Sequence, residues 1–424
     1  MSIPGAGGGG NFFEQILGDL LNLMGPTSGE QGRIELARTL AQGVATGGTP
    51  EGNVDPADRI QYEQLAHVAE LHVAELTGLS LTSSGAPVTL ATVAPGAWAW
   101  RTVEDWRYLL DAMAGPAPAP GTPDGGGAGD TRGGGGTGSG QGLPEGLGLA
   151  DLEPAEAGGG PADLVARWLS TMGPMLAAMQ LGSAVGHLAR TTMGAYELPV
   201  PRPGEGLLVI PANATRFAED WSLPADEVRL WVCLRELTTH AVLARPHVDG
   251  RLRELLTAVV QGMAEDAGTL ADRLQGMDLS DPDALQGLLG DPSSFVQLEP
   301  SPARRHAAEE LMAVVAALLG YVEHVLDEAG ARLLGTRGAV AEAWRRHLVD
   351  RDDAQRAAEA MLGLDLGPGQ IDRGTAFVRG VLERAGEAGL SRLWAETRTL
   401  PTPAEVDAPG LWLERIALGP AEPG

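Results

Sequence analysis

Residues 231–240 read Trp-Val-Cys-Leu-Arg-Glu-Leu-Thr-Thr-His and lie in the middle of a predicted helix. The helix carries Asp226 and Glu227 in its first turn, where the helix dipole favours negative charge, and it runs to about Ala244. Apolar residues at helical spacing predict further helices over about 12–24, 33–44, 55–77, 98–113, 163–193, 246–268, 302–326, 338–349, 352–362 and 370–385. The strand-like stretches are short, at 88–90 and 207–211, so the fold class expected is mainly α with little β structure.

The chain is strongly acidic: its 424 residues include 56 Asp and Glu against 30 basic residues, for a net charge of −26. Such a surface repels phosphate backbones and anionic lipid, so we expect no nucleic-acid partner and no membrane partner. Every basic residue is arginine. The absence of lysine excludes a Walker-type phosphate loop and a Schiff-base cofactor. Cys233 is the single cysteine, which excludes an intrachain disulfide and a zinc ribbon.

One uncharged segment, residues 168–189, is long enough to cross a bilayer. Its serine, threonine, glutamine and histidine side chains favour a helix buried among other helices instead. The glycines at Gly173, Gly182 and Gly186 suit close helix packing. The amino terminus has no cation before Arg33, so it lacks the charged start of a secretory signal, and a cytoplasmic location is expected.

The composition changes abruptly at residues 115–160, where glycine and proline make up about half of the segment. Such a sequence buries too little apolar area to offset its ordering entropy, which predicts a flexible, disordered linker. We therefore expect a small helical module over 1–114, the linker over 115–160 and the main domain over 161–418.

The stretch around Glu236 is close to a known catalytic pattern. Zinc peptidases place two histidines at i and i+4 on one helix, with a glutamate beside the first as general base. Here the glutamate is Glu236, but the histidine positions hold Arg235 and Thr239. A guanidinium has no lone pair to offer a metal. His240 comes one residue late, which turns it about a quarter turn around the helix.

Short motifs follow in order through the carboxy-terminal part of the chain. They are Ile210-Pro211-Ala212-Asn213, Phe217-Ala218-Glu219, Leu223-Pro224, Gly320-Tyr321-Val322-Glu323-His324-Val325, Arg345-Arg346, Gly363-Leu364-Asp365-Leu366, Gln370, Gly374, Phe377, Leu400-Pro401-Thr402, Pro409 and Trp412. This ordered set resembles the actinobacterial zincin-like family, whose members are labelled zinc-dependent metalloprotease or hydrolase.

The resemblance implies a mainly helical, gluzincin-type domain that holds zinc through the helix of the general base and a glutamate from a later helix. Here the three metal positions that it implies are Arg235, Thr239 and Leu319, and the general-base position, Glu236, remains. The resemblance therefore indicates a degenerate member. No cofactor is expected, or zinc if the protein is an active enzyme.

A displaced metal site is the alternative at this point. Glu236 and His240 are four residues apart on one helix, and Glu323 lies one turn beyond the third implied position; two carboxylates and an imidazole suit zinc or manganese. The simpler interpretation pairs Glu236 with Arg229 or Arg235 and leaves His240 as a polar residue near a helix end, where a cation is favoured.

Two functions follow from these alternatives. The first is a non-catalytic pseudoenzyme that binds an unidentified peptide or protein partner in the former active-site groove. The second is a working metallohydrolase, with Glu236 as general base and Arg235 stabilising the oxyanion. A scaffold that depends on the linker is a third, less specific interpretation.

Overall fold

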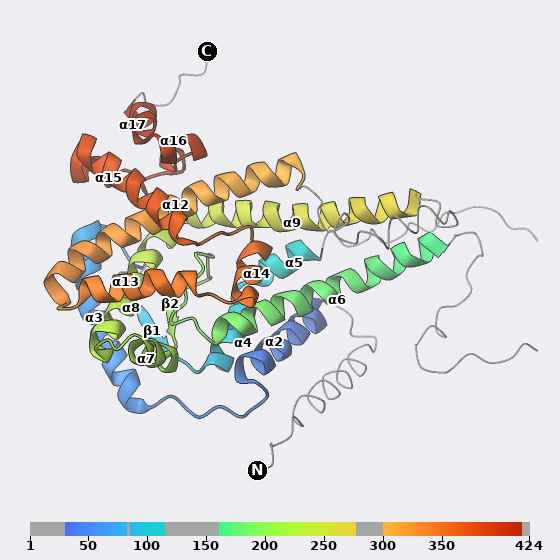
Figure 1. Ribbon diagram of the computed structural model, residues 1–424, viewed down its shortest axis with the longest axis horizontal. Coiled ribbons are helices and arrows are strands. Elements are labelled where there is room, and N and C mark those ends of the chain that lie inside the picture. The colour runs from blue at the N-terminus through green and yellow to red at the C-terminus, as the bar shows by residue number, and fades with distance from the viewer. Residues whose placement is uncertain (1–29, 83–84, 115–160, 277–299, 418–424) are drawn as a thin grey trace, which may run out of the picture.

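A computed structural model describes residues 30–82, 85–114, 161–276 and 300–417, and these are mainly helical (Figure 1). The predicted helix at 12–24 and the predicted linker at 115–160 lie outside the described residues. The helices are α2 (Glu30–Thr46), α3 (Pro56–Thr77), α4 (Pro95–Asp105), α5 (Arg107–Met113), α6 (Pro161–Ala189), α7 (Pro211–Asp220), α8 (Ala225–Leu243), α9 (Pro246–Gly276), α12 (Pro302–Leu333), α13 (Arg337–Val349), α14 (Asp353–Met361), α15 (Pro368–Leu390), α16 (Pro403–Asp407) and α17 (Pro409–Ala417).

Helix ends follow local sequence signals. The side chain of Asp55 caps α3 by accepting a hydrogen bond from the Ala57 N–H, and Gly78 ends that helix with a φ of 65°. One expectation was wrong in detail: the helix predicted over 98–113 is two helices, α4 and α5, which meet at Trp106. Trp106, at the junction, is 1% exposed and belongs to the core.

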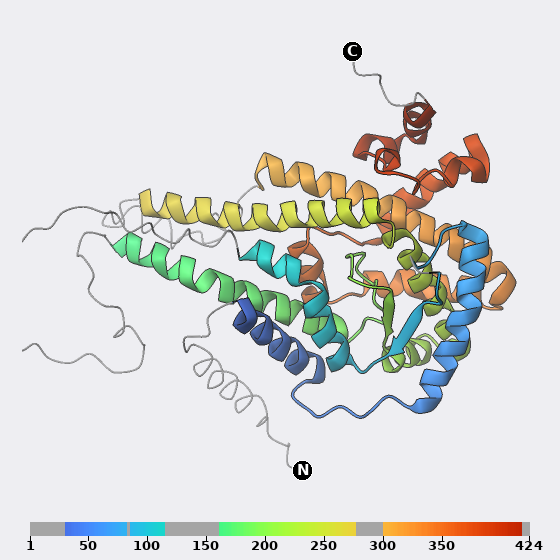
Figure 2. The ribbon, with the colours of Figure 1, turned by 180° about the vertical axis from the view of Figure 1, so that it is seen from behind.

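The sheet has two parallel strands, β1 (Thr89–Thr92) and β2 (Gly206–Val209), paired from Thr89↔Gly206 to Thr92↔Val209. Parallel neighbours need a long crossover connection, so β1 and β2 come from distant parts of the chain. Helix α2 also packs along α6 (Figure 2), and α3 packs on α8. These contacts join residues 30–114 and 161–417 in one hydrophobic core. The division into a module, a linker and a domain stays a prediction.

Helix α8 lies at the centre of this core. It packs against α3, α7, α9 and α12, and every residue from Trp231 to Leu243 is buried. A helix that is covered on all sides needs apolar residues all round, and any polar side chain on it needs a partner inside the protein. Arg235, Glu236 and His240 are therefore held in place by whatever surrounds α8.

Glycines allow two close helix crossings. A Cβ on Gly374 of α15 would lie 1.8 Å from the Ala316 carbonyl oxygen of α12, and one on Gly182 of α6 would lie 2.5 Å from the Ala37 carbonyl oxygen of α2. Gly186 has similar contacts with α2, as the sequence predicted. Gly173 does not, because a Cβ there would meet nothing within 4 Å. Within the described residues no helix is long and apolar enough to span a bilayer, and α6 packs against α2, α4 and α14.

We expect Gly374→Ala to lower the free energy of unfolding by at least about 2–3 kcal/mol, because the new methyl group would overlap backbone atoms of α12. Gly369→Ala in the same helix is the control, since a Cβ there meets nothing within 4 Å. It should leave stability unchanged or raise it by up to about 1 kcal/mol. Urea unfolding of both variants measures the difference; equal values would show that α12 and α15 do not cross at this distance.

Candidate functional site

The three positions at which the family resemblance implies metal ligands lie close together in the structure. Arg235 and Thr239 of α8 and Leu319 of α12 line one cavity of about 10 Å³. This is about the space that a single water molecule occupies. The remaining lining residues come from the segment after α6 and from α12, α13 and α15: Tyr196, Pro199, Leu318, Val322, Glu323, Trp344 and Ile371.

The guanidinium of Arg235 is the nearly buried cation of this site. Its central carbon lies 4.4 Å from the ring centre of Trp344 and 5.9 Å from that of Trp231, a geometry that attracts the cation to the aromatic faces. One of its nitrogens lies 3.8 Å from Glu236 Oε1. The guanidinium therefore supplies positive charge on the cavity side of α8, beside the carboxylate.

The carboxyl group of Glu236 is turned onto the backbone of the segment that follows α6. Its Oε2 accepts hydrogen bonds from the N–H groups of Ala195 at 2.7 Å and Tyr196 at 2.8 Å, and the residue is 2% exposed. A side chain on Gly194 would collide with it, since a Cβ there would lie 2.2 Å from Glu236 Cδ. Burial raises the pKa of Glu236 to about 7, against the opposing effects of Arg235 and the two backbone donors.

The segment held by Glu236 is anchored from other sides as well. The Trp98 indole donates to the Gly194 carbonyl oxygen at 3.0 Å, and Arg202 Nε donates to the Ala195 carbonyl oxygen at 3.0 Å. The two terminal nitrogens of Arg202 donate to Asp105 and Thr102 of α4. Because α4 belongs to the first part of the chain, these bonds bind that part to the site.

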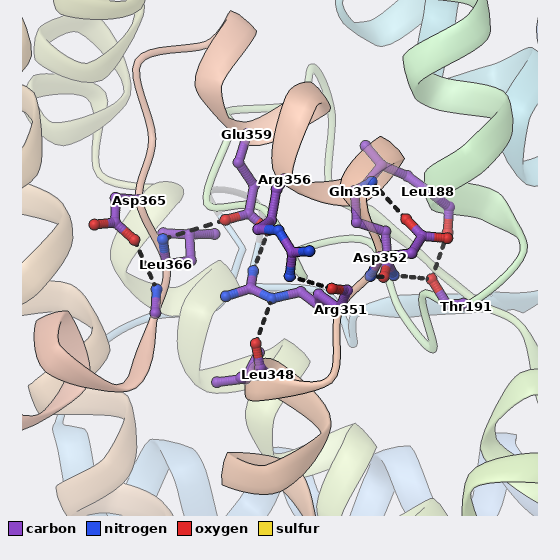
Figure 3. A network of polar contacts seen from close by, with 11 residues as sticks. Leu188, Thr191, Leu348, Arg351, Asp352, Gln355, Arg356, Glu359, Asp365 and Leu366 are labelled. Carbon is purple, nitrogen blue, oxygen red and sulfur yellow. Dashed lines mark hydrogen bonds and ion pairs between the residues drawn. The ribbon is translucent and has the colours of Figure 1, made fainter.

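A polar network ties the end of α6 to α14 (Figure 3). Gln355 of α14 donates to the Thr191 hydroxyl, just after α6 ends. In the same network Arg351 and Glu359 form an ion pair in which both side chains are 6% exposed, and Glu359 also accepts from the Leu366 N–H at 3.3 Å. Burial raises the pKa of Glu359, and Arg351 opposes that rise. The segment after α6 is thus fixed at its start as well as at Glu236.

The other predicted residues have separate partners. His240 Nδ1 lies 3.1 Å from the Tyr196 hydroxyl, and burial holds the pKa of His240 below its usual value, which disfavours the cation that the helix end would favour. Glu323 lines the cavity with Arg345 at 3.8 Å, and burial raises the pKa of Glu323. Of the two pairings expected for Glu236, the structure has the one with Arg235, whereas Arg229 pairs with Asp58 and Asp226.

The residues at this site do not fit a zinc ion. Arg235 has no lone pair, Leu319 has no donor atom, and the hydroxyl of Thr239 donates to the Arg235 carbonyl oxygen at 2.9 Å. Over the part of the chain that the structure describes, no three His, Cys, Asp or Glu side chains are grouped to hold a metal. The displaced set of Glu236, His240 and Glu323 is therefore not brought together here.

Two partners of the site were missed from the sequence. Trp344, which covers the Arg235 guanidinium, directly precedes the Arg345-Arg346 pair, and only that pair drew attention. The backbone donors of Ala195 and Tyr196 carry no side-chain signal at all. Gly194 was the available hint, since a glycine beside a buried carboxylate permits close approach of the backbone.

Comparison with known proteins places the chain in a family. A family model described as zincin-like metallopeptidase matches residues 33–413, so the chain belongs to the zincin-like metallopeptidase family. No curated protein matches it. A crystal structure from Chloroflexus aurantiacus, provisionally described as a hydrolase with a novel fold, is similar at 20% sequence identity and a TM-score of 0.56. The match covers 92% of this chain and 99% of that one, and it shows a shared fold.

We expect Glu236→Ala to lower the free energy of unfolding by about 2–4 kcal/mol, because the buried N–H groups of Ala195 and Tyr196 lose their acceptor. Glu236→Gln keeps a carbonyl oxygen at the same place and should stay within about 1 kcal/mol of wild type at pH 6. Urea unfolding of the three proteins is the measurement. A Glu236→Ala variant as stable as wild type would mean that the carboxyl group does not hold the segment.

The same carboxyl group predicts a pH effect. The pKa of Glu236 is about 7 in the folded protein against an ordinary 4.5, so the folded state keeps this proton to a higher pH than the unfolded chain. Its contribution to stability is therefore full below pH 4.5 and lost as the pH rises through 7. Relative to Glu236→Gln, the free energy of unfolding of wild type should fall by about 2–3 kcal/mol between pH 5 and 8. Parallel curves for the two proteins would contradict the raised pKa.

Proposed function

We propose that this member of the zincin-like metallopeptidase family works in the cytoplasm without a catalytic metal, as a binding protein for a peptide or another protein. One observation carries the proposal: the three implied ligand positions line one cavity, and none of them offers a free metal donor. Arg235 has a guanidinium, Leu319 has an isobutyl group, and the Thr239 hydroxyl is hydrogen-bonded to a backbone carbonyl oxygen. A fold that keeps its framework while losing its metal donors retains surfaces for binding but loses its Lewis acid.

The state of Glu236 supports the same conclusion. A general base must reach the proton it takes within hydrogen-bond distance, directly or through one water. The Oε2 atom of Glu236 is occupied by two backbone N–H groups, and the whole residue is buried. Its contacts are those of a residue that supports structure.

The size of the cavity affects where a partner could bind. A space of about 10 Å³ between α8 and α12 holds about one water molecule, which leaves no room for a segment of a peptide. We expected a partner in the former active-site groove, and that location is not supported by a cavity of this size. We therefore place the partner of the proposed function on another surface.

A working hydrolase stays the second candidate because of one property of Glu236. A pKa of about 7 is suited to a general base near neutral pH, and burial is the usual way in which enzymes reach it. Arg235 beside it would then stabilise negative charge on a substrate oxygen. As a metallohydrolase this candidate also needs a metal ion, for which the described residues offer no cluster of His, Cys, Asp and Glu ligands.

We expect untagged protein, dialysed separately against zinc and manganese, to retain far less than one metal ion per chain by elemental analysis, because the donor set is missing. The R235H/T239H/L319E variant is the matched control: it restores donors at the three implied positions and should retain zinc. Stoichiometric metal in wild type, lost in Glu236→Gln or His240→Ala, would establish a displaced site and overturn the proposal.

Peptide hydrolysis gives an independent test. We expect wild type and Glu236→Gln to show the same background rate on a mixture of fluorogenic peptides, since neither has an activated water. A wild-type rate well above that of Glu236→Gln would favour the hydrolase, because the substitution preserves the hydrogen-bond acceptor and removes the base.

A further inference from the structure

A larger groove lies away from the Arg235 cavity. It has a volume of about 390 Å³ and lies where the end of α3 meets α12 and the end of α15. Its apolar surface comes from Leu76 and from three nearly buried residues, Tyr321, Val325 and Leu390, which are 2–4% exposed. A groove of this size and make-up accepts one or two apolar side chains.

The rim of this groove is acidic. Glu75 of α3, Glu328 of α12 and Glu387 of α15 line it together with one guanidinium, Arg332, and one imidazole, His324. The Glu75 and Glu387 side chains are 65% and 72% exposed. Three carboxylates outnumber the one guanidinium, that of Arg332, which lies 3.5 Å from Glu75, so the rim is net negative.

A kink in α15 gives the groove its third wall. Gly386 has a φ of 61°, which L side chains rarely adopt, and the helix changes direction there. The turn after the kink brings Glu387 within 3.4 Å of His324 Nε2 and places Leu390 against the groove. Position 386, between the two parts of α15, therefore requires a glycine.

An exposed apolar strip continues the groove along α3. Leu71 and Val68 are 59% and 39% exposed, and they lie one and two turns before Glu75 on the same side of the helix. Single exposed apolar residues are ordinary, but these two adjoin an acidic groove with an apolar floor. Together they extend the apolar surface beyond the groove itself.

The rest of this chain does not complement the charge of the groove. The segments outside the described residues (1–29, 83–84, 115–160, 277–299 and 418–424) contain one basic side chain, that of Arg132. Such segments do not complement three carboxylates. The chain as a whole carries a net charge of −26, so a second copy would be repelled as well.

We propose that this groove binds a basic amphipathic peptide segment of a partner protein, with its apolar side chains on Tyr321, Val325 and Leu390 and its arginines or lysines on Glu75 and Glu387. This inference rests on the proposed binding function and names its site and partner chemistry. Helix-in-groove recognition has the same physical parts: an apolar face in the floor and charges that set orientation at the rim.

The test uses a fluorescein-labelled peptide of about 12 residues, or three helical turns, with arginine and leucine at i and i+4 spacing. Binding to the full chain is followed by fluorescence anisotropy at low and at physiological salt. The groove variant is E75Q/E387Q. The matched control is E63Q/E383Q, which removes two carboxylates from the same two helices outside this groove, at side chains that are 56% and 65% exposed.

We expect E75Q/E387Q to weaken binding about tenfold at low salt and E63Q/E383Q less than about twofold. A peptide with serine in place of leucine should bind more weakly than the parent, because it loses contact with the apolar floor. Equal losses in the two double variants, equal binding of the serine peptide, or no binding to wild type would each overturn the proposal.

Metal content and peptide integrity are measured on the same samples. Stoichiometric metal with cleavage of the labelled peptide would end the proposed non-catalytic function, whatever the groove variants do. If the protein is metal-free and leaves the peptide intact, but the groove variants bind the peptide as well as wild type does, only the groove proposal is overturned.

Discussion

The carboxyl group of Glu236, buried against the backbone N–H groups of Ala195 and Tyr196, is the contact around which the rest of the structure is arranged. A buried carboxyl group requires hydrogen-bond donors, and here they come from an irregular segment that enters the core. The carbonyl oxygens of that segment in turn need hydrogen-bond donors, which Trp98, Arg202 and Asn213 supply. One polar group on α8 thus determines which parts of the chain must come together.

The surroundings of Glu236 differ from those that the family motif implies for its glutamate. In the pattern that the sequence resembles, the glutamate of this helix works beside a metal. Here the charge beside it belongs to the guanidinium of Arg235, which is covered by Trp344 and Trp231 and needs no ligands. A fixed cation stabilises a neighbouring carboxylate in place but has no open coordination position. Arg235 therefore places a positive charge beside Glu236 without offering a coordination position to a substrate.

Most helices could be predicted from the chain alone, since apolar spacing and caps such as Asp55 are local signals. The resemblance implied that Arg235, Thr239 and Leu319 occupy the three metal positions of one site, and in the structure all three line one cavity. The pairing of β1 with β2 and the placement of Trp344 over Arg235 could not be predicted. Both join residues more than 100 positions apart, and no local pattern encodes such a distance.

The sequence by itself determined a mainly helical, strongly acidic chain without lysine, and a helix that resembles a zincin motif but has Arg235 and Thr239 on either side of Glu236. Only the tertiary structure decided which partners the other polar residues of the site have. Glu236 turns to a backbone segment, His240 to Tyr196 and Glu323 towards Arg345. The physical reason is that buried polar side chains point to the partners that surround them in three dimensions, and those partners are chosen by packing across the whole core.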